Sequence, residues 1–292
     1  MPQAKIGVIG GSGLYNMEGL SEIEEVRLTT PFGEPSDAII TGNMKGIRVA
    51  FLPRHGKGHR ISPSSLPAKA NIYALKLLGV ERIISVSAVG SLKEEIQPMD
   101  LVIPDQFIDQ TKGRDSTFFN SGIVGHISFA EPFCSVLSQI LSEAATKMGA
   151  KVHKGGTYLA IEGPQFSSKA ESQLYRSWGA DVIGMTALPE AKLAREAEIC
   201  YAMLAIVTDY DCWHLSYETV TAEMILTNLQ KGVDVSKEVL RLTIPGIPQN
   251  RECACATALK YAIATSQKYI SAEARRDLRL LIGKYLDKAE FD

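Results

Sequence analysis

Short apolar segments alternate with longer amphipathic segments along most of this chain, and this alternation is the strongest constraint on its fold. The short segments are rich in β-branched residues, which favour strands, and the longer ones repeat apolar residues at helical spacing. Alternating strands and helices predict βαβ units around a mostly parallel sheet. We therefore expect an α/β protein: a single domain with a mixed, mostly parallel central sheet flanked by helices.

The same pattern predicts the positions of the elements. The expected strands are Lys5–Ile9, Arg48–Phe51, Arg82–Val86, Leu101–Pro104, Thr157–Ile161, Asp181–Met185 and Tyr201–Val207. The expected helices are Pro67–Leu78, Glu131–Met148, Ser168–Trp178, Pro189–Ala197 and Thr221–Arg241. Ser168 and Glu171 have the spacing of a capping box, which marks a helix start.

The residues after Ile244 have a different character. The connector IPGIPQNR precedes two amphipathic stretches, Cys253–Ser266 and Ala272–Leu286, which predict two helices. Because a segment of about 40 residues rarely holds a hydrophobic core alone, a separate domain is disfavoured. We expect a core of residues 1–245 and a helical C-terminal extension, 246–292, of the same domain.

Charge and hydropathy exclude several classes of partner. The chain has 31 basic and 33 acidic residues, a net charge of −2, so it offers no electrostatic surface for nucleic acid or an anionic membrane. Its apolar runs are much shorter than the roughly 18 residues of a membrane span. The N-terminal sequence runs into a strand without a basic and long apolar signal. We expect a cytoplasmic protein.

Five cysteines are spread along the chain: Cys134, Cys200, Cys212, Cys253 and Cys255. Reduced, mostly buried thiols are the simplest interpretation, and intracellular disulfides are expected only in a hyperthermophile. Cys253 and Cys255 are too close in sequence for an easy disulfide. They also lack the second pair that a zinc site needs, so we expect no metal.

Three predicted strands are followed by residues that suit an anion. A glycine-rich turn with Ser12 follows the first strand, Arg54 and His55 follow the second, and Ser87 lies at the end of the third. The glycines do not match the dinucleotide fingerprint G-x-G-x-x-G. Tight packing turns and a solvated basic loop are the alternatives, but strand ends are where open α/β sheets bind ligands. Arginine offers a planar fork to phosphate, and a histidine adds a donor.

Two carboxylates follow the last predicted strand. Asp209 and Asp211 are two residues apart, so in extended backbone their side chains point to the same side. Such a pair can bind a metal, cap a turn or contact a polar ligand. Metal binding is the least favoured, because no histidine or third carboxylate has ligand spacing.

Together these segments resemble the trimeric branch of the purine nucleoside phosphorylase family. The resembling motifs are IGVIGGSGLY, PRHG, SVSAVGSLKEEIQPMDLVIPDQFID, AEPFC, IEGPQFSSKAES, WGADVIGMT and TDYDCW, which occur in this order over about 200 residues. EGPQF and GADVIGMT carry most of the specificity. The resemblance implies the nucleoside phosphorylase fold and a homo-oligomer, either a trimer or a dimer of trimers.

The resemblance also implies residue roles. The phosphate pocket would comprise Ser12, Arg54, His55, Ser87, Ala88 through its backbone, and Thr186. Phe166 would stack on the purine, Met185 would lie under the ribose, and Asp209 and Asp211 would face the purine edge. The segment that lines the 5′-methylthio pocket would comprise Val220, Met224, Ile225 and Leu226, and the neighbouring subunit would lend His126. Gly184 replaces an asparagine that is common in the family.

The implied reaction is phosphorolysis of a small-molecule nucleoside. Phosphate captures an oxocarbenium-like sugar while Asp209 gives a proton to N7 of the departing base, so inorganic phosphate is a co-substrate and no cofactor is needed. The aspartate pair favours adenine, and the apolar segment favours a 5′-methylthio group, as in methylthioadenosine. The alternatives are a 6-oxopurine nucleoside or methylthioinosine phosphorylase, a nucleosidase that uses water, and a nucleotide- or NAD-binding Rossmann protein.

Overall fold

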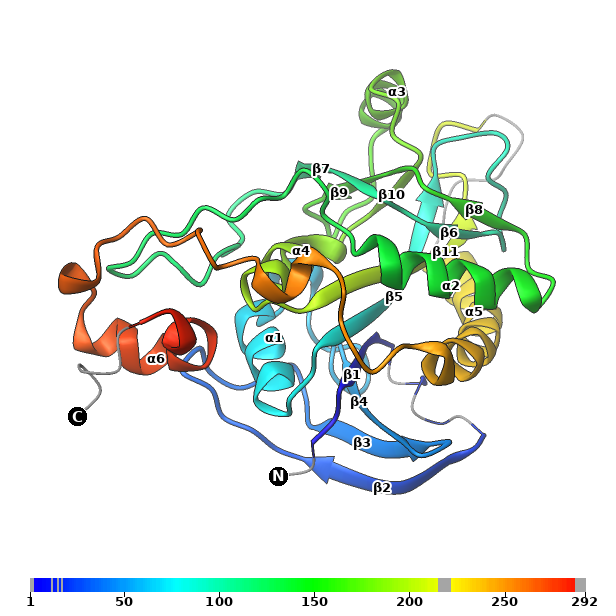
Figure 1. The fold of residues 1–292 in the computed structure, drawn as a ribbon. Helices are drawn as coiled ribbons and strands as arrows, with labels where there is room; N and C mark the ends of the chain where they lie inside the picture. The colour runs from blue at the N-terminus through cyan, green and yellow to red at the C-terminus, as the bar shows by residue number, and fades with distance from the viewer. Residues whose placement is uncertain (1–2, 12, 15, 17, 215–221, 287–292) are drawn as a thin grey trace.

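The computed structural model describes residues 3–11, 13–14, 16, 18–214 and 222–286, without the side chains of 222–227 and 229. One 11-stranded sheet forms its centre (Figure 1). The strands are β1 (Ile6–Gly10), β2 (Leu20–Val26), β3 (Ile39–Met44), β4 (Ile47–Pro53), β5 (Arg82–Ser91), β6 (Leu101–Ile103), β7 (Gln106–Gln110), β8 (Val152–Lys154), β9 (Thr157–Ile161), β10 (Val182–Gly184) and β11 (Cys200–Asp209).

The sheet is mixed and mostly parallel, as expected. β1 pairs in parallel with β4 and β5, and β5 pairs in parallel with β11. A second parallel group, β7–β9–β10, joins the far end of β5 through an antiparallel contact of β10. The N-terminal edge, β2–β3–β4, is an antiparallel meander. Because β5 pairs with β1, β10 and β11, it is the central strand on which the site is built.

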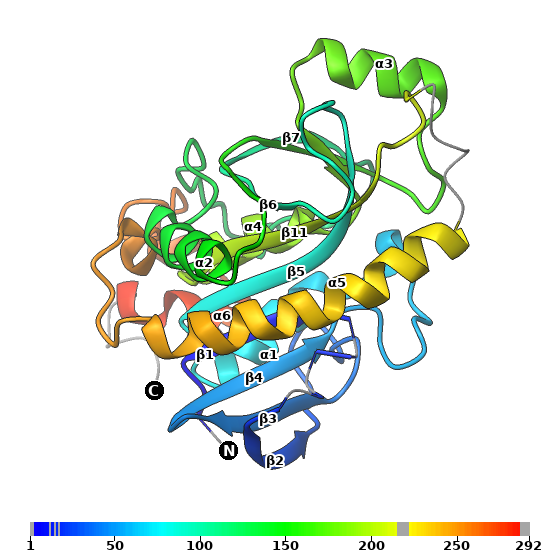
Figure 2. The same ribbon diagram turned by 90° about the vertical axis from the view of Figure 1, so that its right-hand side faces the viewer.

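Helices cover both faces of the sheet, which confirms the α/β class (Figure 2). They are α1 (Ala68–Leu77), α2 (Ser135–Lys147), α3 (Lys169–Ser177), α4 (Ala187–Glu196), α5 (Ala222–Thr243) and α6 (Ala272–Ile282). α2 and α5 pack together and against β11, whereas α1 and α4 pack together on the other face. α3 projects beyond β9 and β10, and the predicted capping box of Ser168 and Glu171 is present at its start.

The seven expected strands are present, with ends that shift by a few residues, but β2, β3, β7 and β8 were not predicted. β2 has the sequence LSEIEEV and a mostly exposed face, so it lacks the apolar run that marks a buried strand. β8 is three residues long and β7 is only half-buried. Edge strands such as these show little of the apolar pattern that predicts a strand, because few of their side chains reach the core.

The C-terminal extension departs from expectation in one helix. The helix expected at Cys253–Ser266 is wrong: the segment forms a short 3-10 turn, Ala254–Thr257, then irregular turns and an isolated bridge between Gly125 and Ile263. The second expected helix is α6, which ends in a further 3-10 turn, Gly283–Tyr285. Apolar residues of the extension share one buried cluster with α1 and α4. The division into a core, 1–245, and an extension of the same domain, 246–292, stays a prediction.

In the part of the chain that the structure describes, no helix combines the length and apolarity that crossing a membrane requires.

Candidate active site

The ends of three neighbouring strands bring the predicted phosphate-binding loops together. Since β1 lies between β4 and β5 and is parallel to both, all three strands end at the same edge of the sheet. The backbone N–H of Arg54 donates to the Gly10 carbonyl at 2.9 Å, which joins the loop after β4 to the turn after β1. A Cβ atom at Gly10 would lie 2.4 Å from Cδ1 of Leu14, so a larger residue would force the buried Leu14 side chain to move. Ser12, predicted to contact phosphate, lies outside the described residues.

The Arg54 side chain is buried, and most of its donors are already used. Nε and Nη2 donate to the two carboxylate oxygens of Glu190 on α4, at 2.6 and 3.1 Å. Nη1 donates to the Val86 carbonyl at 2.8 Å, and Nη2 to Oγ of Ser85 at 2.7 Å. Burial opposes the guanidinium charge, but Glu190 outweighs it and raises the pKa of Arg54 above its ordinary value. The Nε–Nη2 edge of the guanidinium therefore faces Glu190, and a contact of Arg54 with phosphate stays a prediction.

His55 is held in one tautomer. Nδ1 lies 2.8 Å from the Ile61 carbonyl, which can only accept, so Nδ1 carries the hydrogen and Nε2 has a free lone pair. Burial, assisted by the Arg54 charge, lowers the pKa of His55 to about 4, so the ring is neutral near pH 7. The side chain was expected to add a donor. It offers an acceptor instead, which suits a protonated oxygen of an anion.

Two hydroxyl groups meet beside this cluster. Oγ of Ser87, on β5, lies 3.1 Å from Oγ1 of Thr186, directly before α4. Ser87 also donates to the Ala88 carbonyl at 3.2 Å. Folding thus brings Ser87 and Ala88 together with Thr186, 99 residues further along the chain. The Thr186 hydroxyl can donate to an anion bound at this edge of the sheet, and the Ser87 hydroxyl can do so once it rotates away from the Ala88 carbonyl.

Asp209 is the last residue of β11 and its side chain is buried. Oδ2 accepts from the Thr208 hydroxyl at 2.7 Å, and Oδ1 accepts from the Asp211 N–H at 2.8 Å. Burial raises the pKa of this carboxyl, against the effect of both hydrogen bonds. A Cβ atom at Gly90 on β5 would lie 2.9 Å from Oδ1, so only glycine lets the carboxyl take this place. Burial therefore favours the protonated form of this carboxyl, which is the form that can donate a proton.

Asp211 does not continue the extended backbone of β11. Its φ is 52°, because the chain turns after Asp209, so the expectation that both carboxylates project from one side of an extended strand is wrong. The turn-capping alternative is present, since Asp209 accepts the Asp211 N–H. Burial also raises the pKa of Asp211. The hydroxyls of Ser172 and Ser167 oppose this shift from nearby, but neither reaches hydrogen-bond geometry with any described residue.

The loop before α3 meets the loop after β11. Sγ of Cys212 lies 3.2 Å from the Ser167 carbonyl, which places the neighbouring Phe166 close to the aspartate loop. The Phe166 ring is 48% exposed, so it is free to stack on a flat ligand. Met185 is half-buried, and its sulfur approaches Gly163 so closely that a Cβ there would lie 2.5 Å away.

One predicted residue, His126, is not brought to this edge, and the members of another predicted group cannot be placed by their side chains. His126 is exposed and donates its backbone N–H to Ala262 in the C-terminal extension. That segment and the extension lie together away from the end of β11 (Figures 1 and 2). Val220, expected in the methylthio pocket, lies outside the described residues. Its companions there, Met224, Ile225 and Leu226, lie on α5, but their side chains also fall outside the description.

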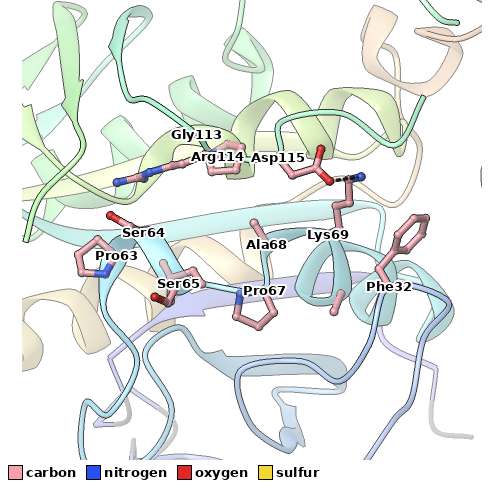
Figure 3. A pocket seen from close by; sticks show the side chains of 13 residues that line it. Phe32, Pro63, Ser64, Ser65, Pro67, Ala68, Lys69, Gly113, Arg114 and Asp115 are labelled. Atoms are coloured by element: carbon pink, nitrogen blue, oxygen red, sulfur yellow. Dashed lines mark ion pairs between the residues drawn. The ribbon is translucent and has the colours of Figure 1, made fainter. Parts of the chain in front are cut away.

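A separate cavity of about 290 Å³ lies beside this edge (Figure 3). It is lined by α1, the segment before it and residues 113–115, and contains none of the predicted site residues. Its cations are paired: Lys69 contacts Asp115 at 2.5 Å, and Arg114 contacts Glu162 at 2.9 Å. Both of these cations are therefore already compensated by a carboxylate.

The expectation that Cys253 and Cys255 lack a second pair of cysteines is wrong. Folding brings Cys134 and Cys200 to them, so the four sulfur atoms all lie within 4.8 Å of one another. The sequence contained no signal for this cluster, because its members come from positions far apart in the chain. The same holds for Glu190, which the sequence analysis did not consider and which lies 136 residues from its partner Arg54.

Known proteins resemble this chain over nearly its whole length. The model of the phosphorylase superfamily matches residues 5–245. An S-methyl-5′-thioadenosine phosphorylase of Chloroflexus aurantiacus (strain ATCC 29366 / DSM 635 / J-10-fl) is 57% identical, covering 98% of this chain and 99% of the relative. One of Koribacter versatilis (strain Ellin345) is 56% identical, covering 97% of each chain.

Solved structures agree with the sequence relatives. The crystal structure of a methylthioadenosine phosphorylase from an Antarctic soil metagenomic library has a TM-score of 0.92 and 49% identity, covering 96% of this chain and 99% of the other. The methylthioadenosine phosphorylase of Schistosoma mansoni in complex with adenine has a TM-score of 0.83 and 38% identity, covering 88% and 96%. The chain therefore belongs to the phosphorylase superfamily, in the family of these S-methyl-5′-thioadenosine phosphorylases.

Proposed function

We propose that this chain is a pentosyltransferase that cleaves S-methyl-5′-thioadenosine with inorganic phosphate, giving adenine and 5-methylthioribose 1-phosphate. The observation that carries the proposal is the buried Asp209 carboxyl, whose pKa is raised, at the same sheet edge as the hydroxyl and imidazole cluster. The relatives and solved structures of the same length, which bear this enzyme's name, support the choice of substrate.

The reaction needs an acid on one side of the glycosidic bond and an anion on the other. As the bond breaks, positive charge develops on the sugar and negative charge on the base. Asp209 in its protonated form gives a proton to N7 of adenine, and burial favours that form. Phosphate stabilises the sugar cation and then bonds to its C1′ carbon. Positioning these two groups supplies most of the catalysis, and no cofactor beyond the phosphate co-substrate is invoked.

The phosphate contacts follow from the donor and acceptor inventory. The hydroxyls of Ser87 and Thr186 donate to phosphate oxygens, with the backbone at Ala88 and the Ser12 hydroxyl completing the cradle. Nε2 of neutral His55 accepts from the protonated oxygen of hydrogen phosphate. Arg54 acts mainly as a positioning residue, because its ion pair with Glu190 ties β4 and β5 to α4.

Contacts to the nucleoside follow from the same arrangement. Phe166 stacks on the purine and Met185 lies under the ribose. Asp211 accepts from the 6-amino group of adenine while Asp209 serves N7. A buried polar site that fits one purine edge discriminates against another by about 10⁴-fold or more. Val220, Met224, Ile225 and Leu226 are proposed to line the methylthio pocket.

The proposed assembly is a homotrimer or a dimer of trimers in the cytoplasm. His126 donates its backbone N–H to Ala262, next to Tyr261, which is 89% exposed, and an exposed aromatic residue beside it suits a subunit interface. A neighbouring subunit would then place His126 against the 5′ end of the nucleoside. In this arrangement each site combines residues of two chains.

Mixing two inactive variants tests this arrangement. Asp209→Asn and His126→Ala subunits, denatured and refolded together, would restore about one quarter of the sites, because each restored site takes one intact residue from each chain. If the mixed oligomers folded but showed no activity, the proposal that two subunits share each site would be contradicted.

A substrate panel with and without phosphate tests the reaction itself. We expect turnover of methylthioadenosine that depends on phosphate, with weaker turnover of adenosine and inosine. Dominant turnover of inosine or methylthioinosine would indicate an oxopurine phosphorylase instead. Turnover that is independent of phosphate would indicate a nucleosidase.

A further inference from the structure

A cluster of four cysteine side chains lies at the opposite end of β11 from the active site. Its members are Cys134, Cys200, Cys253 and Cys255. β11 runs from Cys200 to Asp209, and nine steps of about 3.3 Å separate the two ends by roughly 30 Å. The cluster is therefore too far from the proposed reaction to take part in it, and it needs an explanation of its own.

The cluster joins three separate parts of the fold. Cys134 precedes the first turn of α2, and Cys200 is the first residue of β11. Cys253 and Cys255 lie at the start of the 3-10 turn Ala254–Thr257 in the C-terminal extension. A link among these sulfur atoms would hold the extension against the core.

The geometry of the sulfur atoms is that of a metal site. Four sulfurs at about 2.3 Å from a zinc ion in a tetrahedron are about 3.8 Å from one another. Here all four lie within 4.8 Å of one another, and the pair Cys200–Cys253 is 3.3 Å apart. Movements of about 1 Å or less would close the tetrahedron. Disulfides join sulfurs in pairs and do not require each sulfur to be in reach of three others.

The surroundings suit a buried, negatively charged metal–thiolate group. Cys134, Cys200 and Cys255 are buried, whereas Cys253 is half-buried and borders a small cavity of about 20 Å³. Arg82 and Arg251 line the same cavity, and both are also paired with Glu81.

The chain segments that carry the cysteines are also fixed in place. Nη2 of Arg82 donates to the carbonyls of residues 248–250, which fixes the chain just before Cys253. Cys134 is the residue directly before α2, so it lies at a helix N-terminus, a position that stabilises a thiolate.

We propose that these four cysteines bind one zinc ion in a closed, structural tetrathiolate site. Thiolates select zinc among the common divalent ions, and a site with four protein ligands leaves no position for a substrate. Binding replaces the four thiol protons with one Zn²⁺, so four protons are released and the group carries a net charge of −2. The oxidation state of the sulfurs does not change.

Metal analysis of the whole protein tests the proposal. The protein is purified with a thiol reductant and without chelator, and zinc is measured by elemental mass spectrometry. We expect about one zinc per chain, and five free thiols once the protein is denatured with a chelator. Cys255→Ser should lose most of the zinc, whereas Cys212→Ser, which changes the one cysteine outside the cluster, should keep it.

A cobalt probe covers the case in which a cysteine variant fails to fold. Reduced wild-type protein stripped of metal is titrated with Co²⁺, and one equivalent should give the intense visible absorption of tetrahedral cobalt thiolate, which zinc then displaces. Three results would overturn the proposal: a single free thiol per chain without zinc, which indicates two disulfides; five free thiols that take up neither ion; or zinc retained in Cys255→Ser.

Discussion

Replacing Glu190 by glutamine should destabilise the protein strongly, because it leaves the buried Arg54 guanidinium without its counter-charge. Both side chains are at most 3% exposed, and Glu190 receives Nε and Nη2 of Arg54 and the hydroxyl of Tyr201. Removing one partner of such a pair costs about 3–5 kcal/mol. With an unfolding entropy of about 2.1 cal/mol/K per residue, a chain of 292 residues would lose about 5–8 °C in Tm.

Differential scanning calorimetry at one protein concentration measures this loss. Glu25→Gln is the matched control, since Glu25 pairs with Arg27 and Lys57 on the surface and its loss should change Tm by about 1 °C or less. The double variant Arg54→Met, Glu190→Leu should be more stable than Glu190→Gln, because it removes both charges. A loss of 2 °C is about a third of the expected loss. If the Tm of Glu190→Gln lay within 2 °C of wild type, the claim that Arg54 depends on the Glu190 charge would be refuted.

Three further predictions concern the site and one helix. Gly90→Ala should lower kcat/KM by about 10- to 100-fold by displacing the Asp209 carboxyl, whereas Gly246→Ala, where a Cβ atom meets only a 3.8 Å neighbour, should not. In pH profiles, kcat/KM should fall as the pH rises through the raised pKa of Asp209, because only the protonated acid donates. The same profiles should show no titration of His55 between pH 5 and 8, since its pKa is about 4. Ser168→Ala should lower the unfolding free energy by about 1 kcal/mol in urea titrations, because α3 loses its capping box.

The sequence predicted the helices and strands that a short run of neighbouring residues is enough to mark. β5 and β11 are long and mostly buried, so their apolar runs are unambiguous. β2 could not be found in this way, because its exposed face carries mostly acidic residues. The amphipathic stretch Cys253–Ser266 was mistaken for a helix, because its apolar spacing comes from packing of irregular turns on the core.

The sequence predicted which residues lie at the candidate site but not which atoms they contact. The loops after the parallel strands had to meet at one edge, so Ser87 and Thr186 are found together. The direction of the Arg54 fork could not be inferred, because Glu190 comes from a helix far away in sequence. The turn at Asp211 was missed because aspartate tolerates a positive φ without a glycine to mark it.

The role of Asp209 as the acid that serves adenine is tested most directly by the Asp209→Asn variant. The kcat/KM values for methylthioadenosine and methylthioinosine are compared in both proteins at saturating phosphate. An amide cannot donate the catalytic proton, but it can pair with a 6-oxopurine edge, so the preference for methylthioadenosine should fall by about 10²-fold or more. Equal losses for the two substrates would contradict the account, because the carboxyl would then not contact the base.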